Sequence, residues 1–474
     1  MNNFIDNFNN IFFLGIKGVA MANLAVVLQA MGKNVCGVDV EEEFITDKLL
    51  KKHNINVSYD FKNLPKNIDL FVYSAAHKGI NNPLAKIAIK KQIRLISQAH
   101  LLGKLMNNFE NKIAISGCHG KTTTSSLLSY ALNKLNQNPS YIVGVPFFKD
   151  SFGNDYDGGS YQDKKYFIVE ADEYGVNPPV DKTPKFLKLN PDWIICTNID
   201  FDHPDVYKNI EKTKEAFLKF FDNKKLIINI DDKNLIAVYK KIKNKKNVLT
   251  YGFSKLANYQ IINYRINEEN CQFEIKFKKE STFISEKFTI SLFGKHNISN
   301  ATAVIVQLLN LGFSLDKIKK SIKDFTGAKR RMELISKGDF YLLDDYAHHP
   351  QEIRATLDAA KARFKDKRIV VIFQPHTYSR TISLLKEFKK ALEIADLGFV
   401  LPIFASAREN KNQYQISSSD IVKNSKKLFF CNDEKDLINK LKKHLKKNDV
   451  IFTMGAGDVY KLKLKIKNQK LKVD

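Results

Sequence analysis

Residues 112–128 read K-I-A-I-S-G-C-H-G-K-T-T-T-S-S-L-L. The apolar run Ile113–Ile115 predicts a buried strand, two glycines interrupt it, and the Ser/Ala/Leu-rich segment through Leu132 predicts a helix. A strand, a glycine turn and a helix N-terminus together form a phosphate site, because backbone N–H groups converge there and the helix dipole favours an anion. The stretch therefore predicts a phosphate-binding loop.

Two side chains at the end of this loop suit a nucleotide triphosphate. Lys121 would reach the outer phosphates, and Thr122 would place its hydroxyl on Mg²⁺. The full P-loop spacing requires glycine at Ile115, so the loop is of the shorter G-x-x-G-K-T-T form. The alternative is an ordinary left-handed turn followed by a solvated lysine. The residues that we expect to contact ATP here are Gly117, Cys118, His119, Gly120, Lys121, Thr122 and Thr123.

The length and net charge of the chain limit the number of domains and the classes of partner that we expect. A length of 474 residues predicts three or four domains. The net charge of +25 could indicate a nucleic-acid-binding protein. However, the lysines are spread along the whole chain, and no stripe of aromatic and basic residues stands out. We therefore expect no nucleic-acid partner, and a positive field that attracts anionic nucleotide substrates.

The cysteines and the apolar runs indicate the compartment. The five cysteines are scattered without a C-x-x-C pair, which predicts a reducing compartment and no zinc site. The polar stretch Met1–Asn10 does not resemble a signal peptide. No apolar run is long enough to span a bilayer. We expect a cytoplasmic protein without stable membrane insertion.

The N-terminal segment predicts a β-α-β unit around a glycine turn. A strand at Ile11–Leu14 precedes Gly15 and Gly18, a helix follows, and a second strand ends in Asp39. The G-x-G-x-x-G pattern is broken, which disfavours a nicotinamide cofactor and favours a nucleotide diphosphate. The two substituted glycine positions are Lys17 and Ala20. Asp39 is placed to bond a ribose, or else caps a helix or stabilises the turn.

Acidic residues follow two later strands. Tyr166–Val169 predicts a strand that ends in E-A-D-E at residues 170–173, which suits a Walker-B-like metal position or is a solvated acidic turn. Trp193–Cys196 predicts another strand, which ends in T-N-I-D-F-D-H. His203 closes this motif and could complete a second magnesium site, although a lone histidine is more often a structural hydrogen-bonding group.

The rest of the chain predicts further sheet structure. Residues 259–292 alternate apolar and polar side chains, as antiparallel strands do. From Gly327 onward, strands and helices alternate, which predicts a second doubly wound sheet. Polar motifs follow its strands, at the edge where open α/β sheets bind ligands. The motifs are D-D-Y-A-H-H-P, Q-P-H-T-Y-S-R, S-A-R-E-N and M-G-A-G-D.

Taken together, these motifs resemble the Mur ligase family, ATP-dependent enzymes that attach amino acids to UDP-muramic acid. The resemblance covers nearly the whole chain. It rests on G-C-H-G-K-T-T-T, E-A-D-E, T-N-I-D-F-D-H, G-K-H-N-I-S-N-A, D-D-Y-A-H-H-P, F-Q-P-H and T-M-G-A-G-D. It implies an α/β protein with three domains: a Rossmann-like UDP-binding domain (1–107), a central P-loop ATPase domain with a mainly parallel sheet and a small antiparallel one (108–326), and a C-terminal Rossmann-like amino-acid-binding domain (327–474).

The resemblance also implies roles for individual residues. Two Mg²⁺ ions would be held by Thr122, Glu170 and His203. The catalytic residues would be Lys121, Arg331 and His348. Asn297 and Asn300 would lie near the adenine of ATP, and Arg331 and Asp345 near its phosphates and ribose. The residues expected at the amino-acid and muramoyl-carboxylate site are Tyr346, His348, His376 and Arg380, and those expected to face the UDP are Gly15, Gly18 and Asp39.

The motifs leave two acceptors open within the family. F-Q-P-H, Tyr346 and R-E-N at 408–410 favour members that join L-alanine to UDP-N-acetylmuramate through an acyl phosphate. Tyr174–Phe186 is closer to members that attach a ready-made tripeptide to UDP-N-acetylmuramate during recycling. Lys17 and Thr377 stand where these enzymes usually have glycine and often have arginine. We expect an L-alanine ligase, monomeric or homodimeric; the alternatives are the tripeptide ligase and, remotely, a nucleic-acid-stimulated ATPase.

Overall fold

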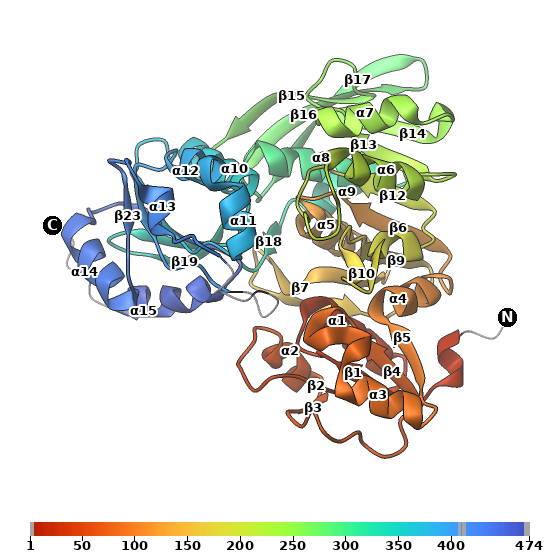
Figure 1. The fold of residues 1–474 in the computed structure, drawn as a ribbon. Coiled ribbons are helices and arrows are strands. Elements are labelled where there is room, and N and C mark those ends of the chain that lie inside the picture. Colours follow the sequence, from red (N-terminus) through yellow and green to blue (C-terminus); the bar gives the residue numbers. More distant parts are fainter. Residues whose placement is uncertain (1–3, 406–408, 410–413, 469–474) are drawn as a thin grey trace. The chain divides into compact units, whose positions relative to one another are not determined.

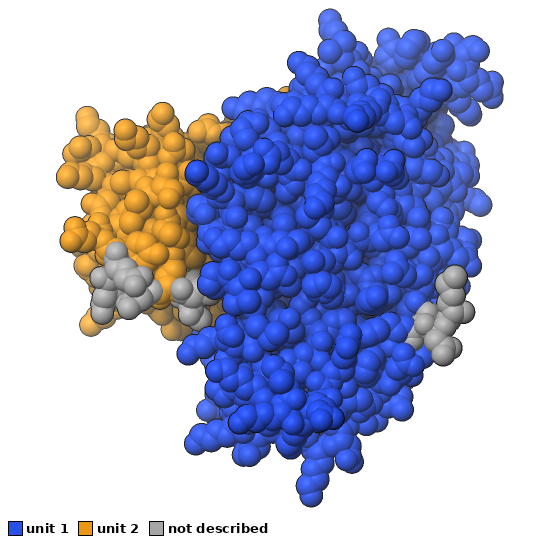
Figure 2. Space-filling model, turned by 45° about the vertical axis from the view of Figure 1, so that its right-hand side comes forward, with its two compact units in different colours: residues 1–264, 273–290, 299–326 blue, residues 265–272, 291–298, 327–474 orange. Residues whose placement is uncertain are grey.

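The computed structural model describes residues 4–405, 409 and 414–468. These residues form two compact units, shown in different colours in Figure 2. The first unit comprises Met1–Tyr264, Phe273–Ile290 and Ser299–Thr326, and the second comprises Arg265–Gln272, Ser291–Ile298 and Gly327–Asp474. The three-domain boundaries expected from the sequence remain a prediction.

The N-terminal part of the first unit holds a five-stranded parallel sheet with the order β3-β2-β1-β4-β5 (Figure 1). Its strands are β1 (Asn10–Leu14), β2 (Asn34–Val38), β3 (Asn56–Ser58), β4 (Leu70–Tyr73) and β5 (Arg94–Ser97). Its helices are η1 (Phe4–Asn7), α1 (Val19–Ala30), α2 (Asp47–Lys52), η2 (Ala76–Asn81), α3 (Pro83–Lys90) and α4 (Gln98–Met106). The strand order reverses between β1 and β4, which is where such sheets bind ligands. Helix α1 begins at Val19, directly after the glycine turn.

The central sheet has the order β17-β16-β15-β14-β13-β12-β6-β9-β7-β18, with β8 paired to β7. Its strands are β6 (Asn111–Ser116), β7 (Ser140–Asp150), β8 (Asp155–Ser160), β9 (Tyr166–Glu170), β12 (Trp193–Cys196), β13 (Lys225–Asn229), β14 (Val248–Gly252), β15 (Tyr259–Ile266), β16 (Cys271–Lys279), β17 (Thr282–Ile290) and β18 (Phe325–Ala328). A separate antiparallel hairpin comprises β10 (Gly175–Asn177) and β11 (Asp181–Pro184). The helices are α5 (Lys121–Lys134), η3 (Lys185–Lys188), α6 (Ile210–Phe220), α7 (Lys233–Lys241), η4 (Lys245–Asn247), α8 (Lys295–Asn310) and α9 (Leu315–Ile322). The predicted phosphate-loop strand is β6, which lies parallel between β12 and β9.

The second unit contains a sheet with the order β19-β20-β24-β21-β22-β23, in which only the β19–β20 pair is antiparallel. Its strands are β19 (Glu333–Lys337), β20 (Tyr341–Asp345), β21 (Ile369–Phe373), β22 (Leu397–Val400), β23 (Leu428–Phe430) and β24 (Val450–Met454). Its helices are α10 (Pro350–Arg363), α11 (Tyr378–Ser383), α12 (Leu385–Leu392), α13 (Ser419–Val422), α14 (Glu434–His444), η6 (Asp458–Lys461) and α15 (Leu462–Asn468). Apolar clusters cover both faces of the sheet, as expected of a doubly wound fold.

One apolar core continues from the N-terminal sheet into the central sheet. It includes Leu24 and Leu101 from the first sheet's helices and Phe167 from β9. Phe109, in the connection between the two sheets, stacks on Phe167 with ring centroids 4.3 Å apart. The shared core explains why both sheets fall in one compact unit. Within the described part of the chain, none of the helices has the length and apolar character needed to cross a bilayer.

A buried amide joins α1 to the central sheet. Asn23 is fully buried, and its Nδ2 donates to the carbonyls of Val143 (2.7 Å) and Val145 (3.0 Å) on β7. A Cβ atom on Gly159 would lie 2.3 Å from the Asn23 carbonyl oxygen. The helix that begins at the first glycine turn is therefore held against β7 and β8.

Replacing Asn23 with alanine should destabilise this junction. A buried carbonyl (Val143) and a half-buried one (Val145) would lose their donor, so we expect the free energy of unfolding to fall by about 1–3 kcal/mol. Urea denaturation would measure the change. Asn34→Ala, which removes an exposed amide bonded to Asn10, is the matched control and should change it by less than about 0.5 kcal/mol. Equal effects of the two substitutions would contradict the role given to Asn23.

Candidate active site

The loop after β6 depends on two glycines in the left-handed region. Gly117 has φ +126° and Gly120, the N-cap of α5, has φ +85°. A Cβ atom at Gly117 would lie 2.2 Å from Thr197 Oγ1, and one at Gly120 would lie 2.8 Å from Asn300 Oδ1. Residues other than glycine are therefore excluded at both positions, by the backbone conformation and by the lack of space for a Cβ atom. The structure also places Asn300 directly against the loop.

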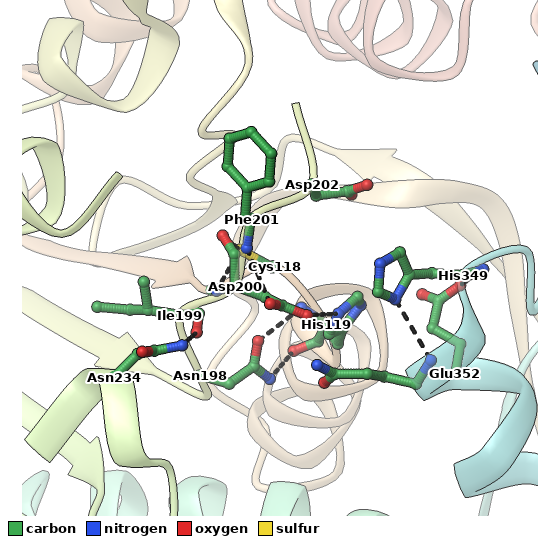
Figure 3. Close-up of polar contacts among 12 residues, drawn as sticks. Cys118, His119, Asn198, Ile199, Asp200, Phe201, Asp202, Asn234, His349 and Glu352 are labelled. Atoms are coloured by element: carbon green, nitrogen blue, oxygen red, sulfur yellow. Dashed lines mark hydrogen bonds and ion pairs between the residues drawn. The ribbon is translucent and has the colours of Figure 1, made fainter. Parts of the chain in front are cut away.

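The segment that follows β12 holds the loop in shape (Figure 3). The His119 N–H donates to Asn198 Oδ1 at 2.9 Å, and Asn198 Nδ2 donates to the His119 carbonyl at 2.8 Å. Cys118 Sγ donates to the Asp200 carbonyl at 3.2 Å and accepts from its N–H at 3.0 Å. His119 Nε2 lies 3.3 Å from Asp200 Oδ2. The T-N-I-D residues thus support the loop backbone from the neighbouring parallel strand.

Lys121 is the cation of this loop. Its Nζ donates to the Gly117 carbonyl at 2.6 Å and to Glu173 Oε2 at 2.8 Å. Burial alone would lower the pKa of Lys121, but the carboxylates of Glu173 and Asp172 outweigh it, and the net effect raises the pKa. The side chain therefore stays charged at neutral pH, as a group that binds phosphate must.

Glu170 lies beside the hydroxyl that the sequence assigned to magnesium. Its Oε2 is 3.4 Å from Thr122 Oγ1, and its Oε1 accepts from Ser125 Oγ at 3.1 Å and from the Gly144 N–H at 2.5 Å. Burial raises the pKa of Glu170. The structure therefore brings together two of the three predicted metal ligands, Thr122 and Glu170.

His203 lies with the other acids of the E-A-D-E motif. Its Nε2 is 3.3 Å from Glu173 Oε1, and ligand atoms of Asp172, Glu173 and His203 lie within 4.8 Å of one another. Burial lowers the pKa of His203, but Glu173 and Asp202 raise it above its ordinary value. Sequence reasoning selected Glu170 as the partner of His203 and did not assign Asp172 or Glu173. The motif itself contained them, but their orientation depends on how the chain turns after β9.

The first glycine turn is closed by Asp39. Gly15 has φ +80°, and Asp39 accepts from the N–H groups of Lys17 (2.7 Å) and Val40 (2.9 Å). His77 Nε2 lies 2.9 Å from Asp39 Oδ1. Asp39 therefore stabilises the turn, one of the three roles that the sequence left open, and its contact with a ribose remains a prediction.

In the second unit, Asp345 ends β20 in a buried position. It accepts from the N–H groups of Met332 and Ala347, both at 2.8 Å, and from Thr356 Oγ1 at 3.3 Å. Burial raises the pKa of Asp345 to about 6, although Arg331 and the backbone donors act in the opposite direction. Burial therefore favours the neutral, protonated form of this carboxyl group.

The other predicted residues of the second unit lie before β19 and after β20 and β21. Arg331 lies 3.9 Å from Glu352 Oε1, and its guanidinium is 5.6 Å from the ring of Tyr346. His348 Nδ1 is 3.2 Å from Glu352 Oε2, and the His348 and His376 rings are 6.2 Å apart. The structure therefore places Arg331 and His348 beside Glu352, which sequence reasoning did not select. The Tyr346 ring lies near both of them, and the His376 ring lies near that of His348.

Three residues near this cluster have unusual backbones. Thr377 has φ +73° and caps α11, and Arg330 (+62°) and Met332 (+48°) flank Arg331. Such strain in non-glycine residues concentrates at functional sites. Arg380 is half-buried within α11. Arg408 and Asn410 of the R-E-N motif lie outside the described residues. Asn297, expected near the adenine, donates through Nδ2 to the Phe293 carbonyl at 2.8 Å.

Three family models match successive parts of this chain. They are the catalytic domain of the Mur ligase family at residues 10–110, the Mur ligase middle domain at 115–308, and the Mur ligase glutamate ligase domain at 330–457. A UDP-N-acetylmuramate–L-alanine ligase from Borreliella afzelii is 36% identical over 477 residues, which cover 96% of this chain and 97% of the relative. The chain belongs to the Mur ligase family.

Solved structures agree with the family assignment. The UDP-N-acetylmuramate–alanine ligase from Thermotoga maritima is 25% identical, with a TM-score of 0.76 over 97% of this chain and 98% of that one. A murein peptide ligase from Psychrobacter arcticus is 23% identical, with a TM-score of 0.70 over the same shares of the two chains. The second likeness shows the fold alone. The α/β fold with three sheet-containing parts expected from the sequence is confirmed.

The buried carboxyl of Asp345 predicts a pH dependence of this Mur ligase's stability. Its pKa is about 6 in the folded chain, against an ordinary value of 3.8. The proton therefore binds more tightly to the folded state, and this stabilisation is fully present below the ordinary value and is lost as the pH rises through the folded value. In denaturant titrations from pH 7 to pH 4, the wild type should gain stability relative to Asp345→Asn. A constant difference across that range would contradict the assignment.

Proposed function

We propose that this Mur ligase is a UDP-N-acetylmuramate–L-alanine ligase, which uses ATP to join L-alanine to the carboxylate of UDP-N-acetylmuramate in peptidoglycan precursor synthesis. The observation that carries the proposal is Lys121, a half-buried cation at a glycine loop, within a chain similar over 96% of its length to a ligase of that name. We further propose a cytoplasmic location and a monomeric or homodimeric state.

The reaction must activate a carboxylate before an amine can attack it. A carboxylate oxygen would attack the γ-phosphorus of ATP, and the bond from that phosphorus to ADP would break. The acyl phosphate would then be attacked at its carbonyl carbon by the amine of L-alanine, the bond to phosphate would break, and an amide would remain. Transfer of a phosphoryl group asks mainly for positioning and for neutralisation of charge, and it needs no nucleophile from the protein.

The loop after β6 suits the phosphoryl transfer. The N–H groups at the start of α5 would face the phosphates, and Lys121 would exchange part of its contact with Glu173 for the γ-phosphate. Arg331, the other catalytic cation that we propose, would stabilise charge on the transferred group. Asn297 and Asn300 would lie near the adenine, and Asp345 near the ribose.

The acidic residues around the loop fit magnesium. Oxygen donors are what Mg²⁺ prefers, and the hydroxyl of Thr122 lies beside the carboxylate of Glu170. A second group, Asp172, Glu173 and His203, offers ligand atoms close to one another. We propose that Thr122, Glu170 and His203, with Glu173, hold two ions. When bound, the ions would neutralise charge on the triphosphate and the acyl carboxylate.

The remaining residues would bind the other two substrates. Gly15, Gly18 and Asp39 would face the UDP, with its diphosphate at the N-terminus of α1. Tyr346, His376 and Arg380 would contact the amino acid and the muramoyl carboxylate. His348 is the candidate that accepts the proton of the amine, because its imidazole is oriented by Glu352 and by the Tyr346 carbonyl.

A second acceptor has one observation in its favour. Residues 174–186, whose sequence is closer to the tripeptide-attaching members, form the β10–β11 hairpin directly after the E-A-D-E motif. If this hairpin determined which acceptor the enzyme binds, the enzyme would attach L-Ala-γ-D-Glu-diaminopimelate to UDP-N-acetylmuramate. The F-Q-P-H motif and Tyr346 favour L-alanine, which we adopt.

Phosphate release tests this function directly. With ATP and UDP-N-acetylmuramate, L-alanine should support faster release than glycine, L-serine or the tripeptide. Lys121→Ala should lower the rate by at least about a hundredfold, because the developing charge loses its positioned cation. Lys134→Ala, at the other end of α5 and beside Asp150, should leave it unchanged. A preference for the tripeptide would replace the proposed acceptor, and full turnover in Lys121→Ala would reject the phosphate role.

A further inference from the structure

Lys17 is a buried lysine in the turn between β1 and α1. Only 1% of its side chain is exposed. Lysine is almost never buried to this extent unless its charge is paired, because removing an ammonium from water is costly.

The ammonium group of Lys17 is paired within the segment that follows β2. Its Nζ lies 3.2 Å from Asp47 Oδ1 and donates to the Glu42 carbonyl at 3.0 Å. It also lies 4.9 Å from the ring centroid of Tyr59 and 5.7 Å from that of Phe44. One cation therefore contacts a carboxylate, a carbonyl and two aromatic faces.

The backbone of Lys17 is bonded to the same segment. Its N–H donates to Asp39 Oδ2 at 2.7 Å, and its carbonyl accepts from Thr46 Oγ1 at 2.5 Å. The Phe44 N–H in turn donates to Asp47 Oδ2 at 2.7 Å. The stretch from Asp39 to Asp47 is thus attached to the glycine turn through both the main chain and the side chain of one residue.

This segment lies where a ligand of the first sheet would bind. It follows the carboxyl end of β2, beside the β1 turn and the reversal of strand order. Phe44 and Tyr59 remain 36% and 52% exposed although a buried cation holds them. Buried ion pairs contribute little to net stability, and their better-supported role is to select one arrangement of the chain. Here the contacts of Lys17 keep the rings of Phe44 and Tyr59 in place at the surface.

We propose that Lys17 is a positioning residue for the uridine end of the UDP-sugar, which it serves by holding Glu42–Asp47 and the Tyr59 ring in the binding arrangement before the ligand arrives. The inference rests on the proposed function. Lys17 should affect binding of the UDP-sugar and not the phosphoryl transfer, because Lys17 lies beside the first sheet and the phosphate loop lies beside the central one. Because this part of the binding site is already ordered, less conformational entropy is lost when the UDP-sugar binds.

Lys17→Met tests the proposal because it keeps most of the length of the side chain and removes the charge. We expect KM for UDP-N-acetylmuramate, and the Kd of UDP measured by calorimetry on the full chain, to rise about tenfold or more, since the segment must then be ordered on binding. The KM for ATP and kcat at saturating substrate should not change. Lys17→Arg, which keeps the charge, should recover part of the affinity. Lys51→Met removes an exposed lysine of α2 and should behave as the wild type.

Asp47→Asn provides a second test that does not require Lys17→Met to fold. It removes the negative partner at 3.2 Å while keeping the size of the side chain, and it should raise the same two constants. Unchanged UDP affinity in a folded Lys17→Met or Asp47→Asn variant would overturn the inference. Equal rises in the KM values for ATP and the UDP-sugar would also overturn it, because they indicate a general loss of structure. Failure of the wild type to bind UDP would reject the proposed function as well.

Discussion

The ammonium of Lys121, held between the Gly117 carbonyl and the Glu173 carboxylate, is the interaction on which the rest of the site depends. A ligase of this kind must bring a triphosphate and a carboxylate into contact. Two like unit charges 4 Å apart repel by about 4 kcal/mol at an effective dielectric constant of about 20. A half-buried cation in place beforehand offsets that repulsion. Glu173 keeps Lys121 charged and oriented while no phosphate is bound.

Backbone geometry supports this charge arrangement. Gly117 and Gly120 allow the chain to turn from β6 into α5, and Asn198 and Asp200 on the neighbouring strand end fix the turn through Cys118 and His119. The N-terminal turn is built in a comparable way, with Asp39 as the acceptor that closes it. In both places the carboxyl edge of a parallel sheet supplies the residues, because neighbouring parallel strands end there together.

The sequence was sufficient where structure depends on neighbours along the chain. The strand, glycine turn and helix within residues 112–128 were predicted correctly, because apolar runs, glycines and helix-forming residues act locally. Pairing across long separations could not be predicted. Nothing in E-A-D-E indicated that Glu173, and not Glu170, faces both Lys121 and His203, since the turn after β9 decides it. Likewise, the burial of Lys17 depends on Asp47 and Tyr59, which are distant in sequence.

Isotope transfer tests the central claim most directly. UDP-N-acetylmuramate labelled with ¹⁸O in both carboxylate oxygens would be turned over with ATP and L-alanine, and the released phosphate examined by mass spectrometry. An acyl phosphate retains the attacking carboxylate oxygen in its bridge to phosphorus, and that oxygen leaves with phosphate. The account predicts one ¹⁸O atom in each phosphate released and one in the amide product. Phosphate free of ¹⁸O, formed together with the amide, would contradict it.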